Sequence, residues 1–151
     1  MASNLINIVD AFSDIATKHL QIHSFGFGNI SEIATSGTVN YPLMYVEADG
    51  LVAKKGEVGF KFKILIMDIV DKDRTNEKDI LNDTSQILLD IFSEFYIGGF
   101  GYGQDYGFEL RQNDITAVNF LDRFDEEVAG WEAGVTIWSP FNWNRCAIPK
   151  T

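Results

Sequence analysis

The sequence is poor in residues that mark several classes of protein. Its 151 residues include one cysteine, three prolines and two histidines. A single thiol cannot form an internal disulfide, and it cannot supply a zinc site built from several cysteines of one chain. With few prolines and 46% hydrophobic residues, the composition is typical of a folded chain and excludes collagen-like or low-complexity disordered segments.

Positive charge is also scarce. Lysine and arginine number 12 against 22 acidic residues, a formal net charge of −10, and Lys54-Lys55 is the densest basic pair. Because nonspecific nucleic-acid affinity comes from cations that neutralise phosphates, we expect no nucleic-acid binding of this kind and no docking on anionic membranes. The sequence has no run of about 20 apolar residues and no basic, apolar leader at its start, which predicts a protein of the cytoplasm.

The length predicts one domain, residues 1–151, and apolar periodicity predicts two amphipathic helices. The first runs from Leu5 to Leu20. The second follows Asn76 as its N-cap, carries Glu77 and Asp79 in its first turn, and ends at the glycines 98–99.

The clearest strand is 58–70, whose even residues from 58 to 66 are apolar while its odd residues become apolar only in the second half. This pattern predicts one wet face at first and burial on both faces later. At about 3.3 Å per residue the strand would span roughly 43 Å, so we expect part of it to protrude. Residues 38–46 are predicted to form an edge strand, because Pro42 lacks a backbone N–H donor. A last hairpin is predicted at 115–124 and 128–138, and 24–37 is predicted to be a loop.

The predicted order is αββαββ. The fold class is α+β, an antiparallel or mixed sheet with both amphipathic helices on one face.

Few residue patterns suggest chemistry. His19 and His23 have the spacing of a metal pair, but no third histidine completes a site. The acidic run from Asp68 to Asp79 could offer oxygen ligands to a divalent cation, although interleaved basic residues favour a solvated turn. The glycines of 98–107 follow a helix instead of opening one, which disfavours a phosphate loop. Cys146 has an arginine beside it but no nearby base in the sequence. We therefore predict no catalytic, cofactor-binding or metal-binding residues.

Aromatic residues offer material for an interface, because large rings bury much area at little entropic cost. The segments around 98–108 and 140–146 are rich in them, and the long strand adds two more. The candidate interface residues are Phe60, Phe62, Phe100, Tyr102, Tyr106, Phe141 and Trp143.

Four stretches together resemble a known family. They are 41–46 (YPLMYV), 60–68 (FKFKILIMD), 76–91 with its DTSQILLDI end, and 131–143 (WEAGVTIWSPFNW) followed by Cys146. The pattern resembles small neck and tail-junction proteins of tailed bacteriophages, most closely a group in crAss-like and related phages. The nearest functional class is the tail terminator.

This resemblance implies a tail terminator-like fold and a structural virion protein, not an enzyme. Subunits would form a ring at the head-tail junction and contact neighbouring neck, portal or tail proteins, first in the host cytoplasm and then in the virion. DNA would pass through the ring. Two alternatives remain open: a metal-assisted enzyme using the carboxylates of 68–79, and a small adaptor that binds one partner through exposed aromatics.

Overall fold

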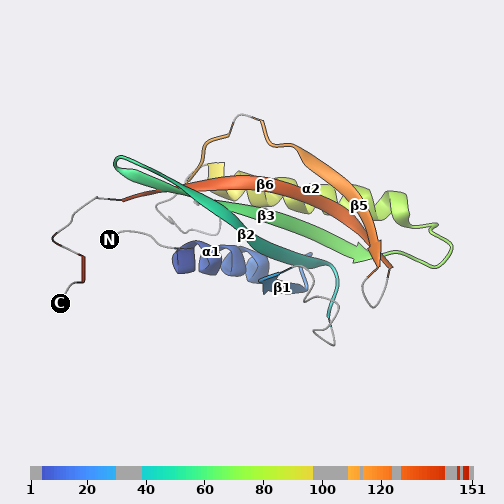
Figure 1. Cartoon of the computed structure of the whole chain (residues 1–151). Helices are drawn as coiled ribbons and strands as arrows, with labels where there is room; N and C mark the ends of the chain where they lie inside the picture. The colour runs from blue at the N-terminus through green and yellow to red at the C-terminus, as the bar shows by residue number, and fades with distance from the viewer. Residues whose placement is uncertain are drawn as a thin grey trace.

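The chain forms a mixed β-sheet with two helices packed on one of its faces (Figure 1). The computed structural model describes residues 5–29, 39–96, 109–112, 114–123, 127–141, 146 and 148–149. In chain order, the elements are α1 (Leu5–Lys18), β1 (Ser24–Phe27), β2 (Leu43–Lys54), β3 (Glu57–Ile69), α2 (Glu77–Tyr96), β4 (Glu109–Leu110), β5 (Ala117–Arg123) and β6 (Glu127–Pro140).

The sheet order runs β1-β2-β3-β6, and β6 then pairs with β4 at one end and with β5 at the other. β1 lies parallel to β2, and every other pairing is antiparallel. The predicted α+β class with a mixed sheet is therefore confirmed, as are both helices.

Several predicted boundaries are wrong. Residues 24–27, predicted as loop, form β1, which pairs with the first four residues of β2. The strand predicted to end at Val46 continues to Lys54, and α1 ends at Lys18 instead of Leu20. β4 was not predicted. Residues 30–38 and the glycines that were expected to end α2 lie outside the described residues.

The main core lies between the helices and the sheet. Phe12 of α1 sits at its centre, with ring centroids 5.2 Å from Phe62 of β3 and 4.9 Å from Phe95 of α2. Both helices therefore cover the same face, as predicted. The sheet contributes alternate residues to this core: Met44, Val46, Phe62, Ile64, Ile66, Ala133, Val135 and Ile137.

The opposite face carries a smaller apolar cluster of Leu43, Tyr45, Leu65, Met67 and Val128. Leu65 and Met67 are the odd residues of the second half of β3, and both are buried. This confirms the prediction that the later part of the strand is covered on both sides.

The junction between β3 and α2 is fixed by Asn76 in a way that the sequence did not indicate. The Asn76 carbonyl accepts the Ile80 N–H at 3.0 Å, which places the residue at the start of the helix. Its side chain accepts the Asp71 N–H at 2.8 Å and donates to the Ile69 carbonyl at 3.3 Å. Asn76 thus ties the helix start to the end of β3.

None of the described helices has the length and apolar character needed to cross a membrane.

Candidate assembly surface

The outer halves of β2 and β3, residues 47–63, form an arm whose tip extends past the helices (Figure 1). The register pairs Glu47 with Lys63 at its base and Lys54 with Glu57 at its tip. The turn between the strands contains Gly56, whose φ of 88° is easily reached only without a Cβ. The expected protruding strand is present as this arm.

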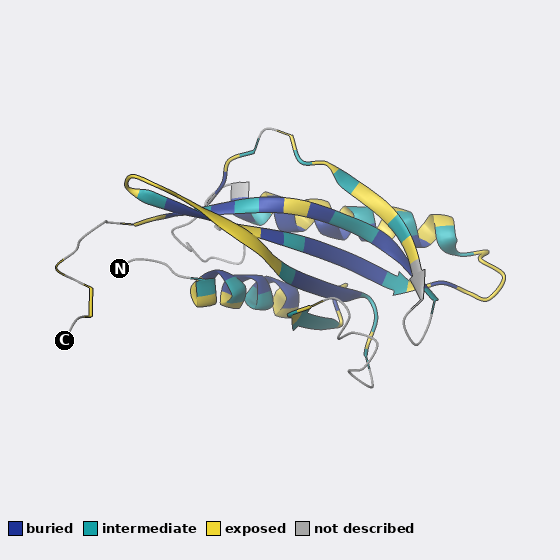
Figure 2. Ribbon diagram, in the orientation of Figure 1, coloured by how far each residue is buried: buried dark blue, intermediate teal, exposed yellow. Residues whose placement is uncertain are grey.

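The β2 side of the arm is exposed along its whole length (Figure 2). All seven residues from Ala48 to Lys54 are exposed, including Leu51 at 60% and Val52 at 38%. The sequence pattern did not indicate that Leu51 and Val52 are exposed, because this apolar pair is short and lies among polar and small residues.

β1 lines only the first part of the outer edge of β2. It pairs with Leu43–Val46, and the Gly28 N–H donates to the Val46 carbonyl at 3.1 Å. Within the described ranges, no strand pairs with the outer edge of β2 beyond that point. A bulge between Ala48 and Gly50 interrupts the inner ladder.

The arm remains anchored to the body through β3. β3 pairs with β6 from Glu57 to Ile69, so the arm is a three-stranded extension instead of a lone hairpin. The N–H of Phe141, just after β6, donates to the Gly56 carbonyl at 2.9 Å. This contact holds the end of β6 beside the tip of the arm.

The candidate interface residues separate into three groups. Phe62 is 0% exposed in the main core, so its assignment to an interface is wrong: the even residues of β3 face the helices. Phe60 packs partly against that core, while Phe141 is 44% exposed near the arm tip. Phe100, Tyr102, Tyr106 and Trp143 lie outside the described residues.

The arm face that points away from the helices has an ordered polar surface. The Trp138 ring lies over Gly59, where an added Cβ would come within 3.1 Å of the indole. The Lys54 amine and the Arg111 guanidinium sit 5.0 and 5.5 Å from a Trp138 ring centroid. Both cations also form ion pairs with Glu57. These contacts stiffen the arm near its tip.

A second exposed edge lies on the far side of the sheet. β5 pairs with β6 over Ala117–Arg123, and its other edge has no partner strand among the residues that the structure describes. Val118 is 62% exposed and Leu121 is 36% exposed on this strand. Among the described residues, the outer part of β2 and β5 are thus two different exposed edges on opposite sides of the sheet.

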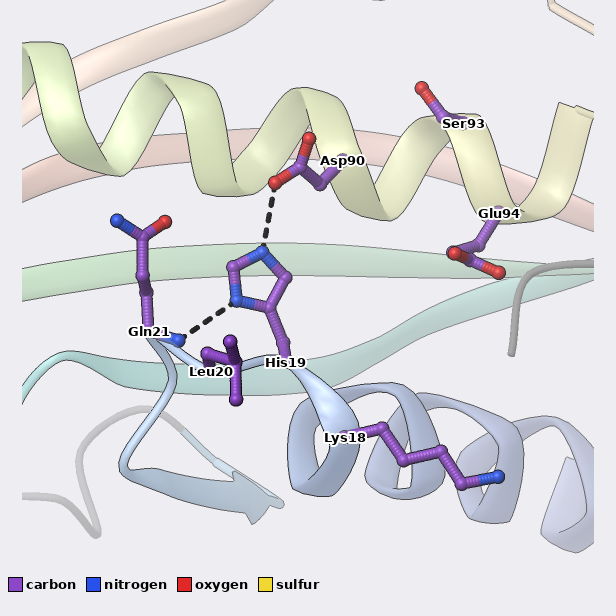
Figure 3. A pocket seen from close by; sticks show the side chains of 7 residues that line it. All are labelled: Lys18, His19, Leu20, Gln21, Asp90, Ser93 and Glu94. Carbon is purple, nitrogen blue, oxygen red and sulfur yellow. Dashed lines mark hydrogen bonds and ion pairs between the residues drawn. The ribbon is translucent and has the colours of Figure 1, made fainter.

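The two histidines do not converge on a metal site. His19 lies in a shallow depression between the end of α1 and α2 (Figure 3), where its Nε2 is 2.8 Å from Asp90 Oδ2. Its Nδ1 accepts the Gln21 N–H at 3.1 Å, so Nε2 carries the proton donated to Asp90. His23 Nδ1 is 2.8 Å from the Tyr41 carbonyl. Each imidazole therefore positions a different chain segment.

The acidic run around the β3–α2 turn is engaged in local contacts. Asp73 Oδ1 accepts the N–H and the hydroxyl of Thr75 at 3.3 and 3.0 Å. Among the described side chains, no group of three or more His, Cys, Asp or Glu residues is placed to hold a metal ion. Cys146 is exposed, and the glycine-rich stretch 98–107 lies outside the described residues.

Asp68 is the described acidic group with a clearly altered environment. Burial raises its pKa above the ordinary value of 3.8, and Asp83 adds to this, while the Ile69 N–H and His23 act in the opposite direction. The folded chain therefore binds this proton more tightly than the unfolded chain. Its contribution to stability increases as pH falls through the raised pKa towards 3.8 and is lost as pH rises.

Asp68→Asn is therefore expected to raise the melting temperature at neutral pH and to flatten its dependence on pH. The asparagine oxygen can still accept the Ile69 N–H, which Asp68 Oδ1 accepts at 2.8 Å. Thermal melts between about pH 4 and pH 8 test this. An unchanged pH profile would show that the Asp68 carboxyl is as well solvated in the folded state as in the unfolded state.

No protein-family model and no curated protein matches this chain. Several chains of solved structures are similar to it; one of them matches over 94% of this chain and 99% of its own length, with a TM-score of 0.49 and 10% sequence identity. The description of that structure names no activity, ligand or partner. A likeness at this level carries no functional argument, so the function is argued from the surface itself.

Proposed function

We propose that this protein is a structural subunit that assembles into a ring, as expected for a neck or tail terminator-like component of a phage particle. The arm is the observation that supports the proposal most directly. Its strand β2 has seven consecutive exposed residues, Ala48–Lys54, and no described strand pairs with their outer edge. An exposed edge strand readily pairs with another chain, and monomeric proteins usually shorten, cover or charge such an edge.

The exposed apolar side chains of the arm favour burial against a partner over permanent contact with water. Leu51 at the middle of the exposed segment is 60% exposed, and Phe141 near the tip is 44% exposed. Burying such side chains against a partner is worth roughly 25 cal/mol for each Å² of apolar surface removed from water. An arm held by β6 presents this surface with little loss of freedom on binding.

The partners proposed are other copies of this chain and neighbouring neck, portal or tail proteins. A ring requires a heterologous contact, in which two different patches of one subunit meet. β2 and β5 supply two such patches at opposite sides of the sheet. The net charge of −10 suits a channel through which DNA passes without adhering. In this proposal the protein is not an enzyme and needs no cofactor.

Leu51→Lys tests the proposal. A lysine in the middle of an edge strand opposes pairing, while an exposed site leaves the fold intact. We expect the substitution to raise the dissociation constant of the oligomer at least tenfold above that of the wild type. Size-exclusion chromatography with light scattering measures this change. The matched control is Leu89→Lys on α2, where the leucine is 54% exposed and far in sequence from either edge.

The controls also separate the alternatives. Equal loss of assembly in both variants would indicate a general effect of charge and would contradict a role for the arm. A defined heterodimer with a virion or host protein, without self-association, would favour the adaptor alternative. A raised melting temperature at saturating Mg²⁺ or Ca²⁺ would favour the metal-dependent alternative.

A further inference from the structure

The two exposed edges of the sheet match each other in length and in character. β5 contains seven residues, and the exposed part of β2 runs from Ala48 to Lys54, also seven residues. Each displays two exposed apolar side chains, Leu51 and Val52 on β2 and Val118 and Leu121 on β5. The part of the β2 edge beyond its bulge, Gly50–Lys54, can therefore pair with part of β5.

The strand directions also agree. β2 is antiparallel to β3, β3 to β6, and β6 to β5, so β2 and β5 run in opposite directions within one subunit. A ring axis inclined to the strands by about 35–45° keeps this direction in the next subunit, apart from the curvature of the ring. The β5 edge of one copy and the β2 edge of the next would then meet as an antiparallel pair.

The backbone of the arm has groups available for that pair. Lys54 and Glu57 close the two-residue turn. Two residues that close such a turn form both backbone N–H···O=C hydrogen bonds with each other. The direction of the backbone N–H and C=O groups alternates along a strand. Those of Lys54 and Val52 therefore point to β3, while those of Ala53 and Leu51 point outward. The bulge before Gly50 limits regular pairing to the part of the edge nearer the tip.

The two edges lie at different heights along the strands. β5 flanks Glu127–Ala133 of β6, whereas the arm is level with Gly134–Pro140 through β3. Joining them staggers neighbouring subunits by about seven residues, roughly 23 Å at 3.3 Å per residue. A sheet that closes on itself needs such a stagger, with strands tilted by about 35–45° to the axis.

We infer that the β2 edge of the arm in one subunit pairs with the β5 edge of the next copy, so that the sheets of all subunits form one continuous, closed sheet. This inference rests on the proposed ring and adds the surface that builds it. The occupant of the arm edge is a second copy of this chain, and the contact is heterologous.

Thiol cross-linking of the full chain tests the contact. In a Cys146→Ser background, Leu51→Cys and Leu121→Cys place single thiols at exposed positions on the two edges, both on the face of the sheet that carries the helices. With a short bismaleimide, a mixture of the two variants should give a covalent dimer at least tenfold more abundantly than either variant alone. The double variant should give a ladder of oligomers. Leu89→Cys, mixed with either variant, is the control for random collision.

Each other outcome overturns the inference. Efficient cross-linking of Leu51→Cys alone would mean that two arms pair with each other around a twofold axis. Rings that form without a cross-link between the two edge positions would place the contact elsewhere and leave the proposed ring standing. A protein that stays monomeric in the Cys146→Ser background and in the wild type would contradict both the ring and the edge contact.

Discussion

Gly130→Ala is expected to prevent the chain from folding. A Cβ at this position would lie 1.8 Å from the Ile66 carbonyl oxygen and 2.9 Å from the Met67 Cα. Both contacts are with the backbone of β3, in the central pairing of the sheet, where Gly130 is opposite Met67. Relief therefore requires the two longest strands to move apart. We expect a cost above about 4 kcal/mol, against a typical total stability of about 5–15 kcal/mol.

Gly134→Ala is the matched control. It lies four residues further along the same strand, is exposed, and has no atom within 4 Å of an added Cβ. Circular dichroism melts and soluble yield should separate the two variants clearly. If Gly130→Ala melted within a few degrees of the wild type, the β3–β6 register at this point would be wrong.

Phe12→Ala is expected to destabilise the fold by about 3–5 kcal/mol, the range for truncating a buried aromatic residue. Phe12 is 0% exposed and is in ring contact with Phe62 of the sheet and Phe95 of α2. Its removal therefore loosens three elements at once, and a cavity left between two helices and a sheet cannot close by moving one of them. Urea unfolding followed by far-UV circular dichroism measures the loss.

Leu20→Ala provides the comparison for this substitution. Leu20 follows α1 and is 93% exposed, so its truncation should change the free energy of unfolding by no more than about 0.5 kcal/mol. A similar loss in both variants would contradict the position of α1 over the sheet. A small loss in Phe12→Ala alone would indicate a core that repacks easily.

The sequence predicted the elements whose apolar residues repeat with a clear period. α2 and β3 are long and strongly patterned, and both lie close to where they were expected. β1 was missed because four residues that include Gly26 carry no period, and their strand geometry comes from pairing with Leu43–Val46. The close contact between Gly26 and the Tyr45 ring also requires a glycine at this position, since a Cβ there would lie 2.5 Å from the ring.

The arm shows why surfaces are harder to predict than cores. Glu47, Asp49 and Gly50 resemble the end of a strand, yet β2 continues because the strongly patterned β3 beside it offers a full set of ladder partners. The same limit explains Phe62. Alternation identifies two faces of a strand, but only the packed helices decide which face is buried.

The mass of the wild-type protein in solution tests most directly the claim that it assembles into a ring. Sedimentation velocity over a concentration series, with negative-stain images of the main species, should give one closed oligomer of defined subunit number. Its mass should be an integral multiple of 17.0 kDa. A single 17.0 kDa species at every concentration, both alone and mixed with the proteins of the proposed particle, would contradict the proposal that this chain builds a ring.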